Sequence, residues 1–229
     1  MDEISSKSLR YTKRWFSYFD LLGFKNLVLN NRIERVLPIY EDVLKVITRK
    51  ADPKKSKGLS YSWFSDTFIL FTKGSSDKEF ALIEQASRLF FQNLILKEIP
   101  VRGSLTIGDL YSLQKKNIFL GKALIDAYEY GEKQNWLGFV LTPSVHAHLK
   151  GSSLELERRA FYRHINDPSI ITHSKPDNVF AYAFNNGEVN GRNPFLKAIQ
   201  SMKAQAGKDY EKKYINTENF IARYEFKRP

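Results

Sequence analysis

The stretch YFDLLGFKNLV, residues 18–28, closes a run of strand-forming residues with one aspartate, Asp20, and follows it with a turn at Gly23. Side chains alternate along a strand, so Tyr18 and Asp20 share one face of the strand predicted over residues 13–20. An aspartate in this position ordinarily caps the helix that follows. The rest of the chain decides between that structural role and a chemical one.

Outward from this strand, hydrophobic spacing predicts helices and further strands. Apolar residues at intervals of three and four predict a helix over residues 33–48. Ser76 and Glu79 form a capping-box pattern ahead of a helix that ends near Leu96. The other predicted elements are a hairpin at LSYSWFSDTFILFTKG (59–74) that turns at Ser65 and Asp66, a strand at VRGSLTIGDLY (101–111) ended by Gly108, a helix at FLGKALIDAYEYGEK (119–133), a strand and short helix at WLGFVLTPSVHAHL (136–149), and two closing strands at RAFYRHIN (159–166) and NVFAYAFNN (178–186).

This order of elements predicts an α+β fold, a ferredoxin-like antiparallel sheet with helices on one face. We expect residues 1–190 to form this domain. Residues 191–229 are expected to add a helical C-terminal extension, broken at Gly207, that packs on the domain or on a partner subunit.

Composition limits the classes of function. The 229 residues suit one domain with a sizeable core, and the 42% hydrophobic content, with 17 Phe and 12 Tyr, excludes a disordered chain. There is no cysteine, which excludes disulfides and thiol catalysis. No membrane span or secretory signal is expected, so we predict a cytoplasmic protein. The net charge of +11 favours polyanionic partners, which include nucleic acid, membrane surfaces and polyphosphate substrates.

Two carboxylates stand at the ends of predicted strands. In a ferredoxin-like sheet the first strand lies beside the hairpin, which brings Asp20 and Asp66 toward each other at one end. Such a pair repels unless a cation lies between the two groups. Hard divalent ions are bound by one or two carboxylates together with substrate phosphates, so the pair predicts a two-metal phosphoryl-transfer site. Gly23 allows close approach of the main chain to a ligand, and Arg102 suits bidentate contact with phosphate.

The segments FDLLGF, FSDTFIL, VRGSLTIG and FLGKALIDAYEYGE, in this order and spacing, resemble the class III nucleotide cyclases over residues 13–146. The resemblance implies that Asp20, Asp66 and the main-chain carbonyl of Leu21 hold two Mg²⁺ or Mn²⁺ ions. It also implies attack of the ribose 3′-hydroxyl of a nucleoside triphosphate on its α-phosphate, with release of pyrophosphate.

The same resemblance implies a substrate-binding role for three further residues and a particular assembly. Gly23 and Phe24 would supply main-chain contacts to the triphosphate, and Arg102 would bind phosphate. Sites in this family form at a subunit interface, so a homodimer with two sites is expected.

The chain departs from the purine cyclases of this family in two places. Their base-reading lysine lies on the first hairpin strand, where this chain has Tyr61 and Ser62. Their ribose-binding Asn and transition-state Arg correspond here to Ile125 and Glu129.

These departures look like the pyrimidine cyclases of bacterial anti-phage Pycsar systems. Those enzymes make cyclic UMP or cyclic CMP from UTP or CTP for a separate effector that senses the cyclic nucleotide. Tyr61 and Ser62 face opposite ways on a strand, so at most one of them contacts the base.

Other readings stay open. One is a purine cyclase, and another is a cyclase fold retained only for binding. A third is a ferredoxin-like domain that binds single-stranded RNA on its sheet. Against the RNA-binding reading, the chain lacks the Lys/Arg-Gly-Phe/Tyr-Gly/Ala-Phe pattern, and carboxylates at the strand ends repel a phosphate backbone. We therefore expect no stable nucleic-acid partner.

Overall fold

The computed structural model describes residues 10–29, 58–174, 177–184 and 193–224, with single positions at 34, 37, 38, 41 and 45. Apart from those positions, the helix predicted over residues 33–48 lies outside the described residues. The strands are β1 (Thr12–Leu21), β2 (Leu59–Phe64), β3 (Thr67–Thr72), β4 (Val101–Leu113), β5 (Ile118–Leu120), β6 (Phe139–Leu141), β7 (Tyr162–Ile165) and β8 (Val179–Tyr182). The helices are α1 (Phe24–Leu29), α3 (Asp77–Leu96), α4 (Lys122–Glu132), α5 (Pro143–Leu149), α6 (Pro194–Gln205) and α7 (Lys208–Tyr224), with 3₁₀ turns η1 (Gln114–Lys116) and η2 (Leu156–Arg158).

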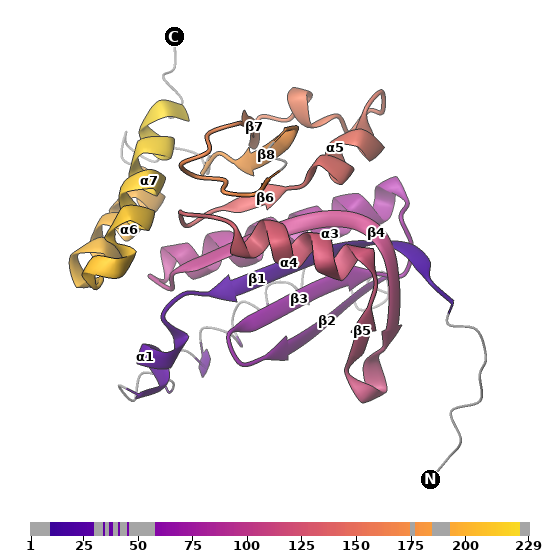
Figure 1. Cartoon of the computed structure of the whole chain (residues 1–229), viewed down its shortest axis with the longest axis horizontal. Coiled ribbons are helices and arrows are strands. Elements are labelled where there is room, and N and C mark those ends of the chain that lie inside the picture. Colours follow the sequence, from indigo (N-terminus) through magenta and orange to yellow (C-terminus); the bar gives the residue numbers. More distant parts are fainter. Residues whose placement is uncertain are drawn as a thin grey trace.

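One sheet joins the strands in the order β2-β3-β1-β4-β6-β8-β7, and β5 pairs with the far end of β4 (Figure 1). The predicted α+β class is confirmed. The sheet is mixed where an antiparallel one was predicted, because β4 and β6 run parallel. β1 and β4 lie at the centre and pair antiparallel from Thr12 to Leu21.

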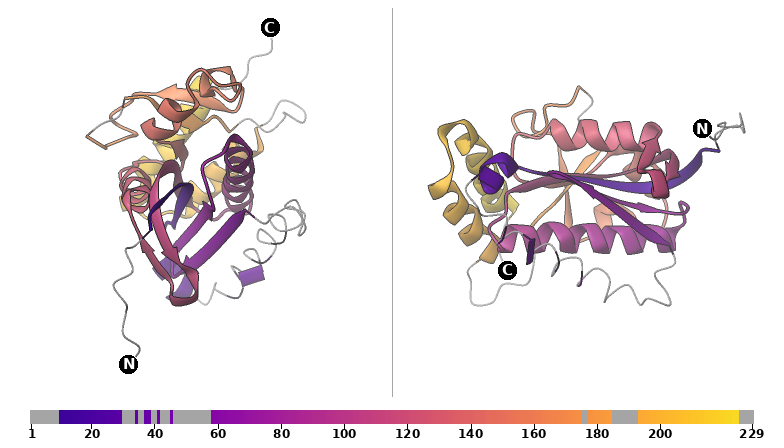
Figure 2. Two further views of the ribbon diagram at one scale, coloured as in Figure 1. Left: turned by 90° about the vertical axis from the view of Figure 1, so that its right-hand side faces the viewer. Right: turned by 90° about the horizontal axis from the view of Figure 1, so that it is seen from below.

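Helices cover both faces of the sheet, where the sequence predicted one (Figure 2). Trp15 and Phe19 of β1 pack into the larger core with α3, whereas Phe16 and Tyr18 face α4 in a smaller cluster. The run from Trp15 to Leu21 is buried at every position. A strand with large side chains on both faces needs cover on both, and α4 supplies the second layer.

Local sequence signals set the helix and strand ends. The capping box is present at α3, where Ser76 Oγ accepts from Glu79 N and Glu79 Oε2 accepts from Ser76 N at 3.0 Å. The predicted strand end at Gly108 is wrong, because β4 continues to Leu113. A Cβ on Gly108 would lie 3.1 Å from the main-chain nitrogen of Ala123, so the lack of a side chain at this glycine allows α4 to pack closely on the sheet.

The two C-terminal helices, α6 and α7, stand at one end of the sheet (Figure 1). Phe195 and Ile199 of α6 and Phe220 of α7 belong to the same buried core as α3. The break between the helices falls at Gly207, as predicted. Among the described residues, no helix combines the length and apolar character that a bilayer crossing requires.

Close packing at the centre of the sheet leads to a first prediction. A Cβ on Gly103 of β4 would lie 2.3 Å from Phe19 Cδ1 and 2.8 Å from the Tyr18 carbonyl oxygen. We expect Gly103→Ala to lower the free energy of unfolding by about 2–3 kcal/mol, the cost of overpacking a core, as measured by urea denaturation. Gly207→Ala is the control, since its Cβ would meet no described atom within 4 Å. Equal stability of both variants would contradict this packing.

Candidate active site

The central pair of strands brings Asp20 and Arg102 together. They are directly opposite in the β1–β4 register, so their side chains leave the same face of the sheet. Arg102 Nε donates to Asp20 Oδ2 at 2.8 Å, and Nη2 lies 2.8 Å from the same oxygen. Both residues are more than 90% buried. The Asp20 carboxylate is therefore neutralised and oriented by its cross-strand neighbour.

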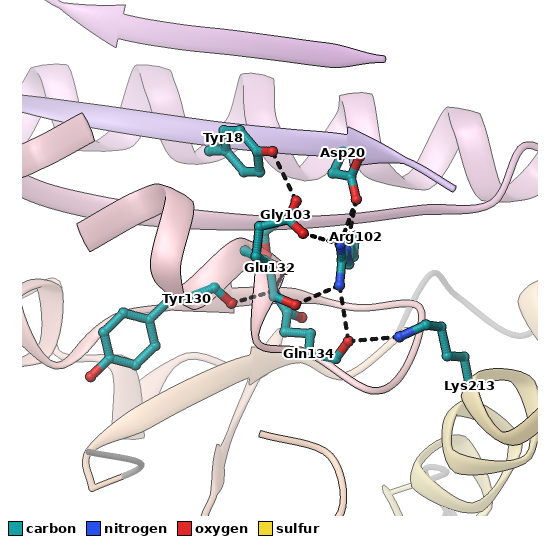
Figure 3. A network of polar contacts seen from close by, with 9 residues as sticks. Tyr18, Asp20, Arg102, Gly103, Tyr130, Glu132, Gln134 and Lys213 are labelled. Atoms are coloured by element: carbon teal, nitrogen blue, oxygen red, sulfur yellow. Dashed lines mark hydrogen bonds and ion pairs between the residues drawn. The ribbon is translucent and has the colours of Figure 1, made fainter. Parts of the chain in front are cut away.

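Arg102 has further partners at the end of α4 (Figure 3). Its Nη2 pairs with the Glu132 carboxylate. Its Nη1 donates to the main-chain carbonyls of Glu132 at 2.5 Å and Gln134 at 3.3 Å. Each guanidinium nitrogen thus has a partner within the chain. The predicted contact of Arg102 with phosphate requires it to exchange one of these partners.

Asp66 lies at the hairpin turn between β2 and β3, next to β1. Its neighbour Thr67 pairs with Asp20, and the main-chain oxygen of Asp66 accepts from Leu21 N at 3.0 Å. Ser65 adopts a left-handed φ of 55°, which suits a tight two-residue hairpin. The predicted approach of the hairpin turn to the end of β1 is therefore present.

The electrostatics of Asp20 reflect its surroundings. Burial raises the pKa of the Asp20 carboxyl, Arg102 lowers that pKa, and the nearby carboxylates Glu132 and Asp66 raise it. The net direction is upward. A carboxylate held ionised in such a place gains from a cation nearby.

The donor set fits hard divalent ions. Within the described residues, Asp20 Oδ1 accepts no hydrogen bond, and the Asp66 carboxylate has neither a hydrogen bond nor an ion pair. The described residues contain no cluster of three or more His, Cys, Asp or Glu arranged for a metal. Two carboxylates leave most of a coordination sphere to main-chain carbonyls and to substrate phosphates, which is how Mg²⁺ is commonly held.

A turn follows β1 at Gly23, as predicted. Gly23 has a φ of 73°, in the left-handed region that favours glycine. Phe24 begins α1, and its half-buried side chain packs on the main core. Gly23 lines a cavity of about 160 Å³ together with Tyr210 and Tyr214 of α7. The C-terminal helices therefore border the turn that was predicted to approach the triphosphate.

The two predicted base contacts lie on different faces of the sheet. Tyr61 stacks on Phe68 with ring centroids 5.9 Å apart, and Phe68 belongs to the core beneath α3. Ser62 is opposite Ile69, which shares the α4 side of the sheet with Tyr18. Only Ser62 is thus on the face that carries Asp20.

Two charged residues of this network were not predicted from the sequence. Glu132 pairs with Arg102 and accepts from the Tyr18 hydroxyl at 3.0 Å. Lys213 of α7 donates from Nζ to the Gln134 carbonyl at 3.1 Å. Burial lowers the pKa of Lys213, and Arg102 lowers it further. No local motif marks either residue, because their roles arise from packing between distant segments.

The chain is similar to proteins of known structure. No protein-family model and no curated protein matches the chain. Solved structures do match. The adenylyl cyclase CyaB from P. aeruginosa aligns with a TM-score of 0.53 and 10% identity, over 79% of this chain and 98% of the other. The guanylate cyclase domain of RhGC from Catenaria anguillulae, in complex with GTP, aligns with a TM-score of 0.53 and 12% identity, over 75% and 96%.

The chain has the fold of a nucleotide cyclase catalytic domain. The catalytic core of a rhodopsin-guanylyl cyclase with converted specificity, in complex with ATPαS, has the same cyclase fold, with a TM-score of 0.52 and 12% identity over 75% of this chain and 95% of that one. The cyclase fold agrees with the fold implied by the sequence resemblance.

Proposed function

We propose that this chain is a metal-dependent nucleotidyl cyclase that converts UTP or CTP to the 3′,5′-cyclic monophosphate and pyrophosphate. The observation that carries the proposal is the position of Asp20 and Asp66 at one end of a cyclase-fold sheet, each with at least one carboxylate oxygen that has no partner among the described residues. Two structures with this fold are complexes with GTP or ATPαS.

Each residue of the site has a distinct task in this proposal. Asp20, Asp66 and the Leu21 carbonyl would hold two Mg²⁺ or Mn²⁺ ions, which when bound neutralise charge on the attacking and leaving oxygens. Arg102 orients Asp20. Gly23 lets the main chain, including the amide of Phe24, approach the triphosphate.

A homodimer through the α4 face is part of the proposal. Ile125 and Tyr128 of α4 are 57% and 53% exposed, and Phe64 at the hairpin turn is 83% exposed on the same side of the sheet. Large exposed apolar side chains gathered on one face are typical of an interface. A second copy would cover them and place two sites at the interface. A monomeric mass in sedimentation equilibrium would contradict this assembly.

The proposal is tested by incubating the protein with Mn²⁺ and each of ATP, GTP, CTP and UTP, and identifying the products by mass spectrometry. We expect a cyclic 3′,5′ product from UTP or CTP. Product from ATP or GTP alone would support a purine cyclase instead. Absence of a cyclic product from all four would refute the cyclase proposal.

Base selection leads to a second prediction. Ser62 shares the face of Asp20 and offers a hydroxyl to the base, whereas Tyr61 points to the α3 side. Loss of one such hydrogen bond is worth about 1.4 kcal/mol, so Ser62→Ala should raise KM for the preferred nucleotide about tenfold. Tyr61→Phe, which removes a hydroxyl on the opposite face, should leave KM unchanged. A larger effect from Tyr61→Phe in steady-state kinetics would reverse the assignment.

The proposal extends to a cellular role. In the proposed role, the cyclic pyrimidine nucleotide acts in the cytoplasm as a second messenger of anti-phage defence, sensed by a separate effector. Residues 1–190 would form the catalytic domain and residues 191–229 the helical extension.

A further inference from the structure

One face of α7 is bonded to the loop that follows α4. Residues three and four apart lie on the same side of a helix, and three such side chains reach the main chain of residues 134–137. The contacts are Lys213 Nζ to Gln134 O at 3.1 Å, Asn216 Nδ2 to Asn135 O at 2.7 Å, and Leu137 N to Thr217 Oγ1 at 2.8 Å. The C-terminal helix thereby satisfies consecutive polar groups of this loop.

The same loop holds Arg102. The Gln134 carbonyl accepts from Lys213 and also from Arg102 Nη1 at 3.3 Å, as Figure 3 shows. The buried side chain of Gln134 donates to the carbonyls of Gly103 and Tyr130, each at 2.9 Å. Contacts to the sheet, to α4 and to α7 therefore hold Gln134 in place, and its main-chain carbonyl with it.

The charges around Arg102 determine how Lys213 affects its position. Arg102 is one cation between two carboxylates, Asp20 and Glu132. Lys213 adds a second cation on the far side of the shared Gln134 carbonyl. Two like charges that share an acceptor repel each other, so Lys213 favours the position of Arg102 against the carboxylates. The Lys213 ammonium is half buried, and this burial lowers the pKa of Lys213.

We propose that Lys213 is a positioning residue for the cyclase reaction, which keeps Arg102 against Asp20 through the Gln134 carbonyl. Helix α7, which lies in the helical extension, then supports the site of the catalytic domain, although it is far along the chain from Asp20. This inference rests on the proposed cyclase function. It assigns Lys213 no contact with the substrate.

Steady-state kinetics of matched lysine variants test the proposal. A small displacement of a catalytic group costs one to two orders of magnitude, so Lys213→Met should lower kcat about tenfold or more and leave KM within about twofold. Lys213→Arg, which restores a donor and a charge, should recover most of kcat. Lys212→Met is the control, because Lys212 is exposed at the preceding position of the same helix.

A second measurement reports on Arg102 without any turnover. In ¹⁵N NMR of the nucleotide-free protein, we expect the Arg102 Nε–H to exchange with solvent about tenfold faster in Lys213→Met. Without the Lys213 contact, Arg102 would separate from its partners more often, and exchange occurs from such locally open states. It should stay at the wild-type rate in Lys212→Met. If the wild-type protein makes no cyclic product, the proposed function fails, and an unchanged exchange rate in Lys213→Met would separately refute the positioning of Arg102.

The remaining outcomes are also decisive. A wild-type kcat in Lys213→Met overturns the proposal whatever the exchange rate. A raised KM with unchanged kcat overturns it as well, because it indicates direct contact with substrate. A loss of kcat that only matches a loss of folded protein, measured by circular dichroism, assigns Lys213 a structural role instead.

Discussion

Asp66→Asn is expected to abolish formation of the cyclic nucleotide while the protein stays folded. The amide keeps the size of the side chain but removes the charge that would hold a divalent cation. We expect turnover to fall more than about a hundredfold, since stabilisation by a bound metal ion is worth several kcal/mol. Asparagine is well tolerated in turns, and the bond from Leu21 N goes to the main-chain oxygen of Asp66, which the substitution retains.

The measurement is product yield by mass spectrometry, with thermal unfolding followed in parallel. Asp109→Asn is the matched control, because Asp109 is an exposed aspartate on β4 away from the site. Retained activity of Asp66→Asn would remove Asp66 from the metal site. Loss of folding would show that Asp66 serves only the hairpin turn.

The second large effect concerns stability. Arg102→Met should lower the free energy of unfolding by about 3–5 kcal/mol, the usual cost of removing one partner from a buried ion pair. The substitution leaves the carboxylates of Asp20 and Glu132 close together without their shared cation. It also leaves the carbonyls of Glu132 and Gln134 without a donor from Arg102. Urea denaturation monitored by fluorescence measures the change.

A surface ion pair gives the comparison for this variant. Arg158 pairs with Glu155 and is 74% exposed, so Arg158→Met should cost less than about 1 kcal/mol. Adding Asp20→Asn and Glu132→Gln to Arg102→Met should recover part of the lost stability, since the unpaired charges are then gone. An equal, small effect of Arg102→Met and Arg158→Met would mean that Arg102 is not the cation on which this buried network depends.

Much of the fold follows from short-range patterns. β1, the hairpin at Ser65 and Asp66, and the capped helix α3 all depend on alternation, turn chemistry or caps within a few residues. The approach of Asp20 to the hairpin turn follows in turn, because β3 pairs antiparallel with β1. These features could be predicted since each segment's own preference agrees with the final structure.

Other features depend on which segments meet. Alternation separates Tyr61 from Ser62, but only the β2–β3 register shows which of them shares the face of Asp20. The partners of Arg102 come from positions as far away in sequence as Asp20 and Gln134. Helix α4 covers the second face of the sheet because it packs closely against β4 at Gly108. The sequence pattern had indicated a strand end at this glycine.

The bond from Lys213 to the Gln134 carbonyl also bears on the order of biosynthesis. A ribosome makes β1 and β4 long before α7, and domains commonly begin to fold during synthesis. The Asp20–Arg102 pair can therefore form on a growing chain, but the loop beneath Arg102 gains its anchor only when α7 has been made and has docked. On our proposal for Lys213, a nascent chain would carry the two carboxylates that we propose bind metal and still be slow in turnover until α7 is in place.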